Sequence, residues 1–152
     1  LAHTGLAVFC FGVMMTEGLS VEKDVAAKPG QQFVIGAYQF TFQGVQQITG
    51  PNYIAQRGAI AIAKNQQAIT ILHPEKRQYA SGGSTLTEAD MHGNASRDLY
   101  VALGEPIDDQ GGWALRLYVK PFIRWIWFGA LMMALGALLV VFDKRFKAKP
   151  AP

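Results

Sequence analysis

Residues 97–142 read RDLYVALGEPIDDQGGWALRLYVKPFIRWIWFGALMMALGALLVVF, and this stretch decides how the chain is organised. Two alternating, strand-like runs come first, then a Lys-Pro pair, and then a long apolar run. Phe122 to Phe142 has the length that a membrane-spanning helix needs, roughly 20 apolar residues. Its single charge, Arg124, lies one turn in, where a long side chain can reach back to the interface. A core helix of a soluble protein would rarely run this far without a polar face, so we predict a transmembrane helix over residues 121–142.

The residues at the two ends of this helix predict its orientation. Trp125 and Trp127 lie at its beginning, and indole rings prefer the headgroup level of a bilayer. Beyond its end, four of the last ten residues are basic, namely Lys144, Arg145, Lys147 and Lys149. The positive-inside rule therefore predicts that residues 143–152 form a cytoplasmic tail and that the domain before the helix lies outside.

A second apolar stretch, LAHTGLAVFCFGVMM, occupies residues 1–15. As a helix it would reach about 22 Å, against about 30 Å of hydrocarbon. We therefore expect residues 1–16 to be the end of a transmembrane helix, and the chain, which begins with Leu1, to be a fragment of a longer protein. The alternative is the remnant of a signal peptide, but a basic beginning and a small-residue cleavage site are both missing.

His3 is the residue of this first stretch that indicates a function. In a helix it would lie roughly 20 Å from the exit near Thr16, well inside the membrane. An ionisable side chain at that depth is costly and points to a functional site. A neutral imidazole can ligate haem iron, or it can simply form a hydrogen bond with a neighbouring helix.

Charge and cysteine content exclude several classes of function. The net charge of +3 arises largely from the C-terminal tail, and residues 16–120 carry no basic stripe of the kind that binds nucleic acid. Cys10 is the single cysteine and lies in an apolar segment. The chain therefore has no internal disulfide, no thiol-redox pair and no cysteine-based zinc site.

Residues 17–120 alternate between apolar and polar side chains, in short runs separated by turn signals. This pattern predicts a small antiparallel β domain of about seven strands, either an OB-like barrel or a sandwich. The expected strands cover residues 17–27, 32–35, 38–45, 53–64, 68–72, 99–103 and 113–119. Asn65 and Gln66 are expected to turn a hairpin, although they lack the glycine that would strengthen this prediction.

Two polar segments of this domain are expected to be exposed. Pro74 ends a strand because it cannot join a hydrogen-bonded ladder, and residues 75–77, Glu-Lys-Arg, then form a polar corner. Residues 79–96 are small and polar, which predicts a surface loop with a short helical turn at 85–91.

The remaining candidate ligands occur in turns. His73 and His92 are each predicted to be solvated histidines rather than ligands. Asp108 and Asp109 precede two glycines, which favours a solvated turn over a metal or acid–base site. No spacing fits zinc, calcium or a two-carboxylate hydrolase.

Several blocks of the chain resemble the C-terminal part of the CcmF/NrfE family. The most specific are RDLYVALGE at 97–105 and WALRLYVKPFIRWIWFGALMMALG at 113–136. The others are LAHTGLAVFCFGV at 1–13, GPNY at 50–53, PEKRQY at 74–79 and LTEADM at 86–91. The family comprises membrane haem lyase subunits of bacterial cytochrome c maturation and their relatives in nitrite-reductase assembly.

This resemblance implies a location and an activity. The chain would belong to a multi-pass protein of the bacterial cytoplasmic (inner) membrane, with the β domain in the periplasm. The complex would attach haem delivered by holo-CcmE to the CXXCH motif of apocytochrome c, together with a CcmH-type subunit. The AHTG segment matches a family histidine that ligates a transmembrane haem b, so His3 is expected to be an axial ligand of the haem iron.

The tryptophan-rich segment and the outer histidines that hold the substrate haem in this family have no counterpart here, and no catalytic constellation is evident. Two alternatives therefore stay open. The domain could be a periplasmic partner-docking module without catalytic residues, or an accessory domain of a membrane transporter.

Overall fold

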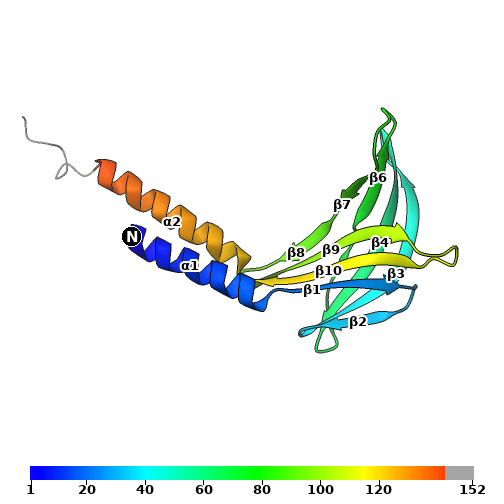
Figure 1. Ribbon diagram of the computed structural model, residues 1–152, viewed down its shortest axis with the longest axis horizontal. Helices are drawn as coiled ribbons and strands as arrows, with labels where there is room; N and C mark the ends of the chain where they lie inside the picture. Colours follow the sequence, from blue (N-terminus) through cyan, green and yellow to red (C-terminus); the bar gives the residue numbers. More distant parts are fainter. Residues whose placement is uncertain (143–152) are drawn as a thin grey trace, which may run out of the picture. The chain divides into compact units, whose positions relative to one another are not determined.

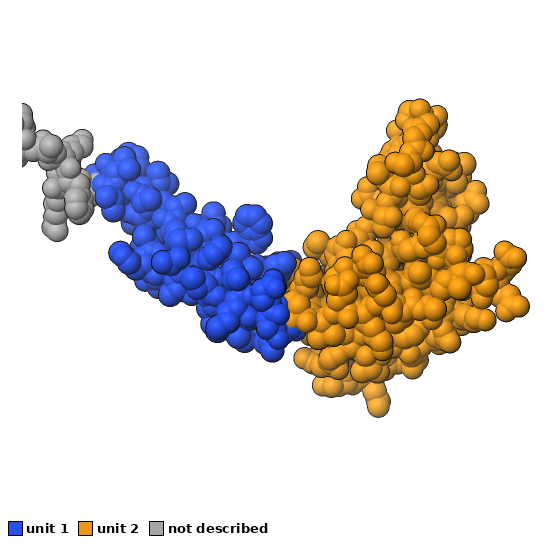
Figure 2. All heavy atoms as spheres, viewed as in Figure 1, with its two compact units in different colours: residues 1–19, 95–97, 121–152 blue, residues 20–94, 98–120 orange. Residues whose placement is uncertain are grey.

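A computed structural model describes residues 1–142 and divides the chain into two compact units. The first unit comprises residues 1–19, 95–97 and the part of the chain from 121 onward, and the second comprises residues 20–94 and 98–120 (Figure 2). The expected basic tail, residues 143–152, lies outside the described residues.

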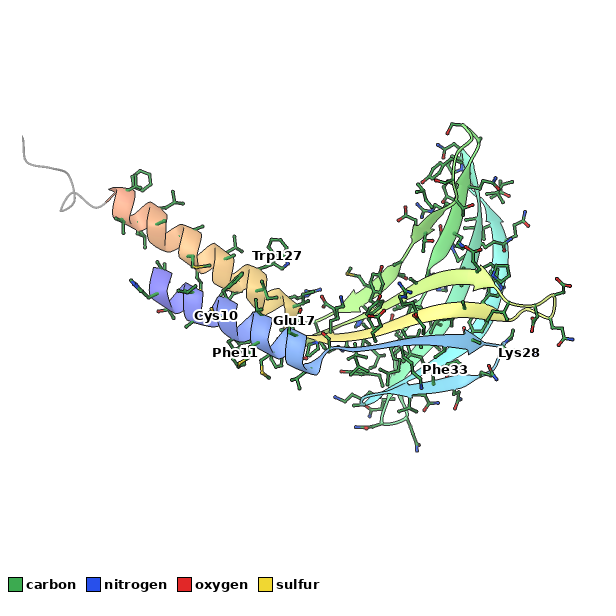
Figure 3. All side chains as sticks on the ribbon, viewed as in Figure 1. Cys10, Phe11, Glu17, Lys28, Phe33 and Trp127 are labelled. Atoms are coloured by element: carbon green, nitrogen blue, oxygen red, sulfur yellow. The ribbon has the colours of Figure 1, made fainter. Side chains whose placement is uncertain are left out.

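The first unit is a pair of helices, α1 (Ala2–Leu19) and α2 (Ile123–Phe142), which lie side by side in Figure 1. Both are long and apolar enough to cross a membrane. They run antiparallel, because Gly5 lies against Met133 and Gly12 against Ile126. Trp127 is 72% exposed and projects from α2 on the side away from α1 (Figure 3).

Four buried glycines, seven residues apart on each helix, form the contact between α1 and α2. They are Gly5 and Gly12 on α1, and Gly129 and Gly136 on α2. A Cβ atom added at Gly12 would lie 2.8 Å from the backbone nitrogen of Ile126, and one at Gly5 only 2.7 Å from that of Met133. Since small residues allow helix backbones to approach closely in a membrane, any side chain at these positions would push the helices apart.

The chain enters α2 through a corner that side chains and backbone hold together. The hydroxyl of Thr16, in the last turn of α1, donates to the carbonyl oxygen of Pro121 at 2.9 Å. Phe122 adopts a left-handed conformation with φ of 58°, and its N–H donates to the carbonyl of Ser96 at 3.1 Å. Such a conformation costs of order 1 kcal/mol for a residue other than glycine, and these two hydrogen bonds offset it.

Aromatic side chains fill the same corner. The rings of Phe11, Phe122 and Trp125 contact each other edge to face, with centroids 5.8 to 6.1 Å apart. The indole N–H of Trp125 also donates to the carbonyl oxygen of Ala95 at 2.9 Å. These contacts join three separate segments of the chain at the point where α2 begins.

The second unit is a β-sandwich of ten strands in two sheets. Neighbouring strands such as β1 and β10, β3 and β4, and β8 and β9 pair antiparallel. One sheet has the order β1-β10-β9-β8, with β1 (Val21–Ala27), β10 (Trp113–Pro121), β9 (Arg97–Pro106) and β8 (Asp90–Gly93). The other has the order β2-β3-β4-β6-β7, with β2 (Gln32–Ile35), β3 (Tyr38–Thr49), β4 (Tyr53–Lys64), β6 (Glu75–Tyr79) and β7 (Leu86–Glu88). β5 (Gln67–Leu72) pairs with β4 beside β6.

The core lies between the two sheets and follows from the alternation of the strands. Phe40 pairs with Ile62 and Phe42 with Ile60 across β3 and β4, and all four are at most 1% exposed. The facing sheet contributes buried residues from β9 and β10, namely Leu99, Val101, Leu103, Leu115 and Leu117. Because successive side chains of a strand point to opposite faces, the residues between them form the outer surface.

The prediction of a sandwich is confirmed, but the structure has ten strands rather than about seven. The three additional strands are β6, β7 and β8, which fall in the segments expected to be a polar corner and a surface loop. The helical turn expected at 85–91 is wrong, since these residues include β7 and the start of β8. Pairing with β4 and β9 overrides the weak strand preference of this small, polar segment.

Two local predictions have different outcomes. Residues 17–19, expected to begin a strand, are the last turn of α1, where the hydrogen bond of Thr16 holds the helix end. Asn65 and Gln66 do turn the β4–β5 hairpin, with φ values of 49° and 64°. Positive φ at both central residues is the signature of a type I′ turn.

We predict that Gly12→Val separates the helices, because its side chain meets the backbone of α2. Overpacking of this kind typically costs about 1–3 kcal/mol. The change is measured as a lower midpoint of thermal unfolding in detergent micelles, followed by circular dichroism. Gly18→Val in the same helix is the matched control, since a Cβ there meets nothing within 4 Å. Equal midpoints for the two variants would rule out the close glycine contact.

Candidate functional site

His3 lies in the first turn of α1, with its side chain exposed within the described part of the chain. The face of α1 that packs on α2 is formed by Gly5, Gly12 and Thr16. His3 is not on that face. Ala7 and Cys10, four and seven residues further on, are also exposed, and this spacing places them on the same side of the helix as His3. His3 therefore stands at the end of a strip of α1 that α2 leaves open.

The other two histidines of the chain lie in the sandwich. His73 is exposed between β5 and β6, where its ring Nδ1 lies 3.2 Å from the carbonyl oxygen of Gly58 and its backbone N–H donates to Asp90 at 2.7 Å. His92 is half-buried in β8, opposite Leu99, rather than in the expected loop. His3 is therefore the one histidine of the chain that lies in a helix, whereas His73 and His92 lie in the sandwich.

An ionic cluster that the sequence did not reveal lies on the outer side of the second sheet. Glu75, expected at an exposed corner, is 4% exposed and accepts hydrogen bonds from Arg57 at 2.5 Å and from Arg77 at 2.7 Å. The guanidinium of Arg77 stacks over the ring of Tyr53, 4.8 Å from its centroid. The expectation of a polar corner is therefore wrong, because β6 pairs with β4 and places Glu75 opposite Arg57.

The charge of Glu75 depends on its two arginine partners. Burial alone would raise the pKa of Glu75, but the hydrogen bonds from Arg77 and Arg57 outweigh it and hold the pKa below its ordinary value. A carboxyl whose pKa is lowered by folding stabilises the fold above its unfolded pKa, about 4.3. This contribution is lost as the pH falls through the lower, folded pKa.

We predict that Glu75→Gln lowers the free energy of unfolding at pH 7 by about 2 kcal/mol, since it removes the charge from two hydrogen bonds with Arg57 and Arg77. Because the effect requires an ionised Glu75, the difference from the unchanged protein should shrink as the pH falls below about 4. Denaturant unfolding at several pH values measures it. Glu88→Gln is the control, since that carboxylate is 48% exposed and 4.0 Å from Arg77, so its loss should cost below about 1 kcal/mol. A Glu75→Gln difference that does not change with pH would contradict this account.

The loop at residues 107–112 is a turn, as expected. Asp108 Oδ1 accepts from the backbone N–H of Gly112 at 2.8 Å and of Gln110 at 3.0 Å, and Lys28 lies 3.4 Å from the carboxylate. The bonds from Gly112 and Gln110 and the nearby Lys28 hold the pKa of Asp108 below its ordinary value. The carboxylate is therefore used to form the loop. Among residues 1–142, no cluster of three or more His, Cys, Asp or Glu side chains could hold a metal ion.

Comparisons with known proteins match almost the entire chain. The family model described as the CcmF C-terminal beta-sandwich matches residues 18–121. The chain is 47% identical to the cytochrome c-type biogenesis protein CcmF of Escherichia coli over 99% of its length, and 44% identical to that of Pseudomonas fluorescens over 98%. It is also 34% identical to the cytochrome c-type biogenesis protein NrfE of Haemophilus influenzae over 97%. It spans only 22% to 23% of the length of these relatives.

A solved structure has the same fold. The chain named cytochrome c heme lyase CcmF superposes with a TM-score of 0.71 at 21% sequence identity. The match covers 93% of the present chain and 24% of that structure. The helix pair and the sandwich therefore occur together in that larger protein.

Proposed function

Because the chain belongs to the CcmF family, we propose that it acts in the maturation of c-type cytochromes as part of a haem lyase complex. That complex would attach haem delivered by holo-CcmE to the CXXCH motif of apocytochrome c. Within that complex, this chain would have two roles. Its first helix would supply a ligand to a transmembrane haem b, and its sandwich would serve as a scaffold outside the membrane.

The exposed position of His3 is the observation that carries the haem proposal. Its side chain stands clear of α2, and Ala7, one turn away, is small enough to leave room for a flat ring beside the imidazole. His3 would be one axial ligand of the haem iron, and bound haem would supply one-electron redox chemistry. α1 and α2 contain no other histidine, so a second histidine ligand would come from outside these two helices.

We predict that His3→Ala, made in the protein purified from its native membranes, loses bound haem b or its low-spin absorption spectrum. Added free imidazole should restore the low-spin spectrum, since it can occupy the space that the side chain leaves. The pyridine haemochrome assay and the reduced absorption spectrum measure the two effects. His73→Ala and His92→Ala are the matched controls and should keep haem content and spectrum unchanged.

An unchanged spectrum in His3→Ala would reduce His3 to a packing residue. Loss of haem in the two control variants as well would point to general unfolding, and it would contradict a specific role for His3. After either outcome, the scaffold role of the sandwich would be the preferred function of this chain.

The proposed location is the bacterial cytoplasmic (inner) membrane, with the sandwich in the periplasm and residues 143–152 in the cytoplasm. Two features support it. The chain contains two helices able to cross a membrane, and the tail that follows α2 in sequence is basic. The predicted boundaries, with residues 17–120 outside and residues 1–16 and 121–142 inside the membrane, belong to this proposal.

We predict that a cysteine placed at Ser84, in the exposed loop between β6 and β7, reacts with a membrane-impermeant maleimide in intact spheroplasts. Cys10 is first replaced by Ser, so that a single thiol remains. A cysteine at Ala148 in the basic tail is the matched control, and it should react only after the membrane is permeabilised. The reverse pattern would overturn the proposed orientation.

A second function, docking without catalysis, is favoured for the sandwich itself. Its strongest polar cluster, Arg57, Glu75 and Arg77, is satisfied by internal ion pairs, and its Asp108 loop is satisfied by backbone groups. We therefore assign the sandwich the task of holding partners, among them the CcmH-type subunit, holo-CcmE and the apocytochrome. If the sandwich only holds partners, the reacting groups of the lyase come from other parts of the complex.

A further inference from the structure

An open groove of about 720 Å³ lies on the outer face of the sheet formed by β1, β10 and β9. Its floor is made of small residues from these three neighbouring strands, namely Ala26, Ala114, Ala102 and Gly104. Ala26 pairs directly with Ala114, and a Cβ added at Gly104 would lie 2.9 Å from the Cβ of Ala114. The strands therefore expose a shallow floor with no bulky side chain to fill it.

The walls of the groove are aromatic and apolar. Tyr100 and Tyr118 meet edge to face across β9 and β10, with ring centroids 5.2 Å apart. Ile107, which also lines the groove, is 53% exposed. Tyrosine and arginine, both present here, are among the residue types enriched in the buried centres of protein interfaces.

The rim of the groove along β1 is acidic. Arg116 is shared by two carboxylates, those of Asp24 at 2.8 Å and Glu22 at 3.6 Å. All three side chains are more than half exposed, so the cluster offers solvent one negative charge in excess. At the far end of the tyrosine pair, Lys120 lies 5.0 Å from the ring centroid of Tyr118. A molecule that covers the groove would thus meet an apolar floor beside the exposed carboxylates of Asp24 and Glu22.

We propose that this groove docks a segment of a partner protein that presents a bulky apolar side chain beside a basic residue. The open shape favours a macromolecular partner, because small-molecule sites enclose most of their ligand's surface. The small-residue floor fits the apolar side chain, and the carboxylates of β1 fit the basic one. This inference rests on the scaffold role proposed above and identifies the face that performs it.

The test uses the full chain in detergent micelles, labelled with ¹³C at its alanine methyl groups, and two synthetic nine-residue peptides. Both have a threonine-rich extended sequence with a central Phe, which is flanked by two Lys in one peptide and by two Glu in the other. The Lys peptide should shift the methyl signals of Ala26, Ala102 and Ala114 in a saturable manner, and the Glu peptide should bind at least about tenfold more weakly, a difference of about 1.4 kcal/mol.

Variants establish whether binding occurs in the groove. Ala102→Phe fills the floor and should weaken binding of the Lys peptide about tenfold. Ala61→Phe is the matched control, since Ala61 is a half-buried alanine on the outer face of β4 in the other sheet, and it should bind as the unchanged chain does. Circular dichroism confirms that both variants fold. Should Ala102→Phe itself misfold, Asp24→Asn with Glu22→Gln replaces it and should weaken binding of the Lys peptide to the level of the Glu peptide.

The proposal is overturned if the peptides leave the three floor methyls unshifted at millimolar concentration. It is also overturned if Ala61→Phe weakens binding as much as Ala102→Phe does, or if the two peptides bind equally. These results would leave the haem proposal intact, because His3 is tested by absorption spectroscopy. Conversely, an unchanged absorption spectrum in His3→Ala would not affect the proposal that the groove docks a partner.

Discussion

The close contact between α1 and α2 at four glycines is the constraint from which the rest of the arrangement follows. Because the helices are antiparallel and touch along their backbones, the chain must leave one and return to the other at nearly the same place. The sandwich meets this requirement by pairing its first and last strands, with Val21 opposite Val119. The hydroxyl of Thr16 then joins the end of α1 to Pro121. A domain whose terminal strands were far apart could not be inserted between these helices.

The same contact decides which side of α1 remains available. Gly5 and Gly12 turn one face of the helix towards α2, so His3 is left on an open side. In a bilayer, a polar side chain on such a side requires a partner, since the hydrocarbon provides none. Helix packing therefore supports the haem proposal independently of family membership. In the sandwich, by contrast, Glu75 is paired with Arg57 and Arg77, and the groove floored by small residues is open to a partner.

The sequence predicted those features of the fold that depend on local patterns. Hydropathy indicated both helices, and period-two alternation indicated the strands that form the core, including the β3 and β4 segments with Phe40, Phe42, Ile60 and Ile62. It missed β6 because a Glu-Lys-Arg run after a proline is typical of an exposed corner. Burial of Glu75 depends on Arg57, 18 residues away, and such a pairing has no local signal. Glu75 and Arg77 are two residues apart and therefore lie on one face of β6, and Tyr53 and Arg57 lie on the same face of the paired strand β4. This pattern could be recognised only once the two strands were known to pair.

Helix rise alone gives the predicted depth of His3 in a membrane-spanning helix, whereas the exposure of its side chain could be inferred only by knowing which face of α1 packs on α2. The seven-residue spacing of glycines on both helices contains that information, but only when the two helices are considered as a pair. The groove could not be foreseen, since single alanines and a glycine in three strands become a floor only in the register that joins them.

Potentiometric titration of the haem in His3→Met tests the central claim most directly, because methionine can replace histidine as an axial ligand and a Met/His pair raises the reduction potential. The account predicts that this variant retains haem and has a clearly higher potential than the unchanged protein, with an altered absorption spectrum. A haem with the same potential and spectrum in both proteins would contradict it, because the axial ligand would then lie elsewhere.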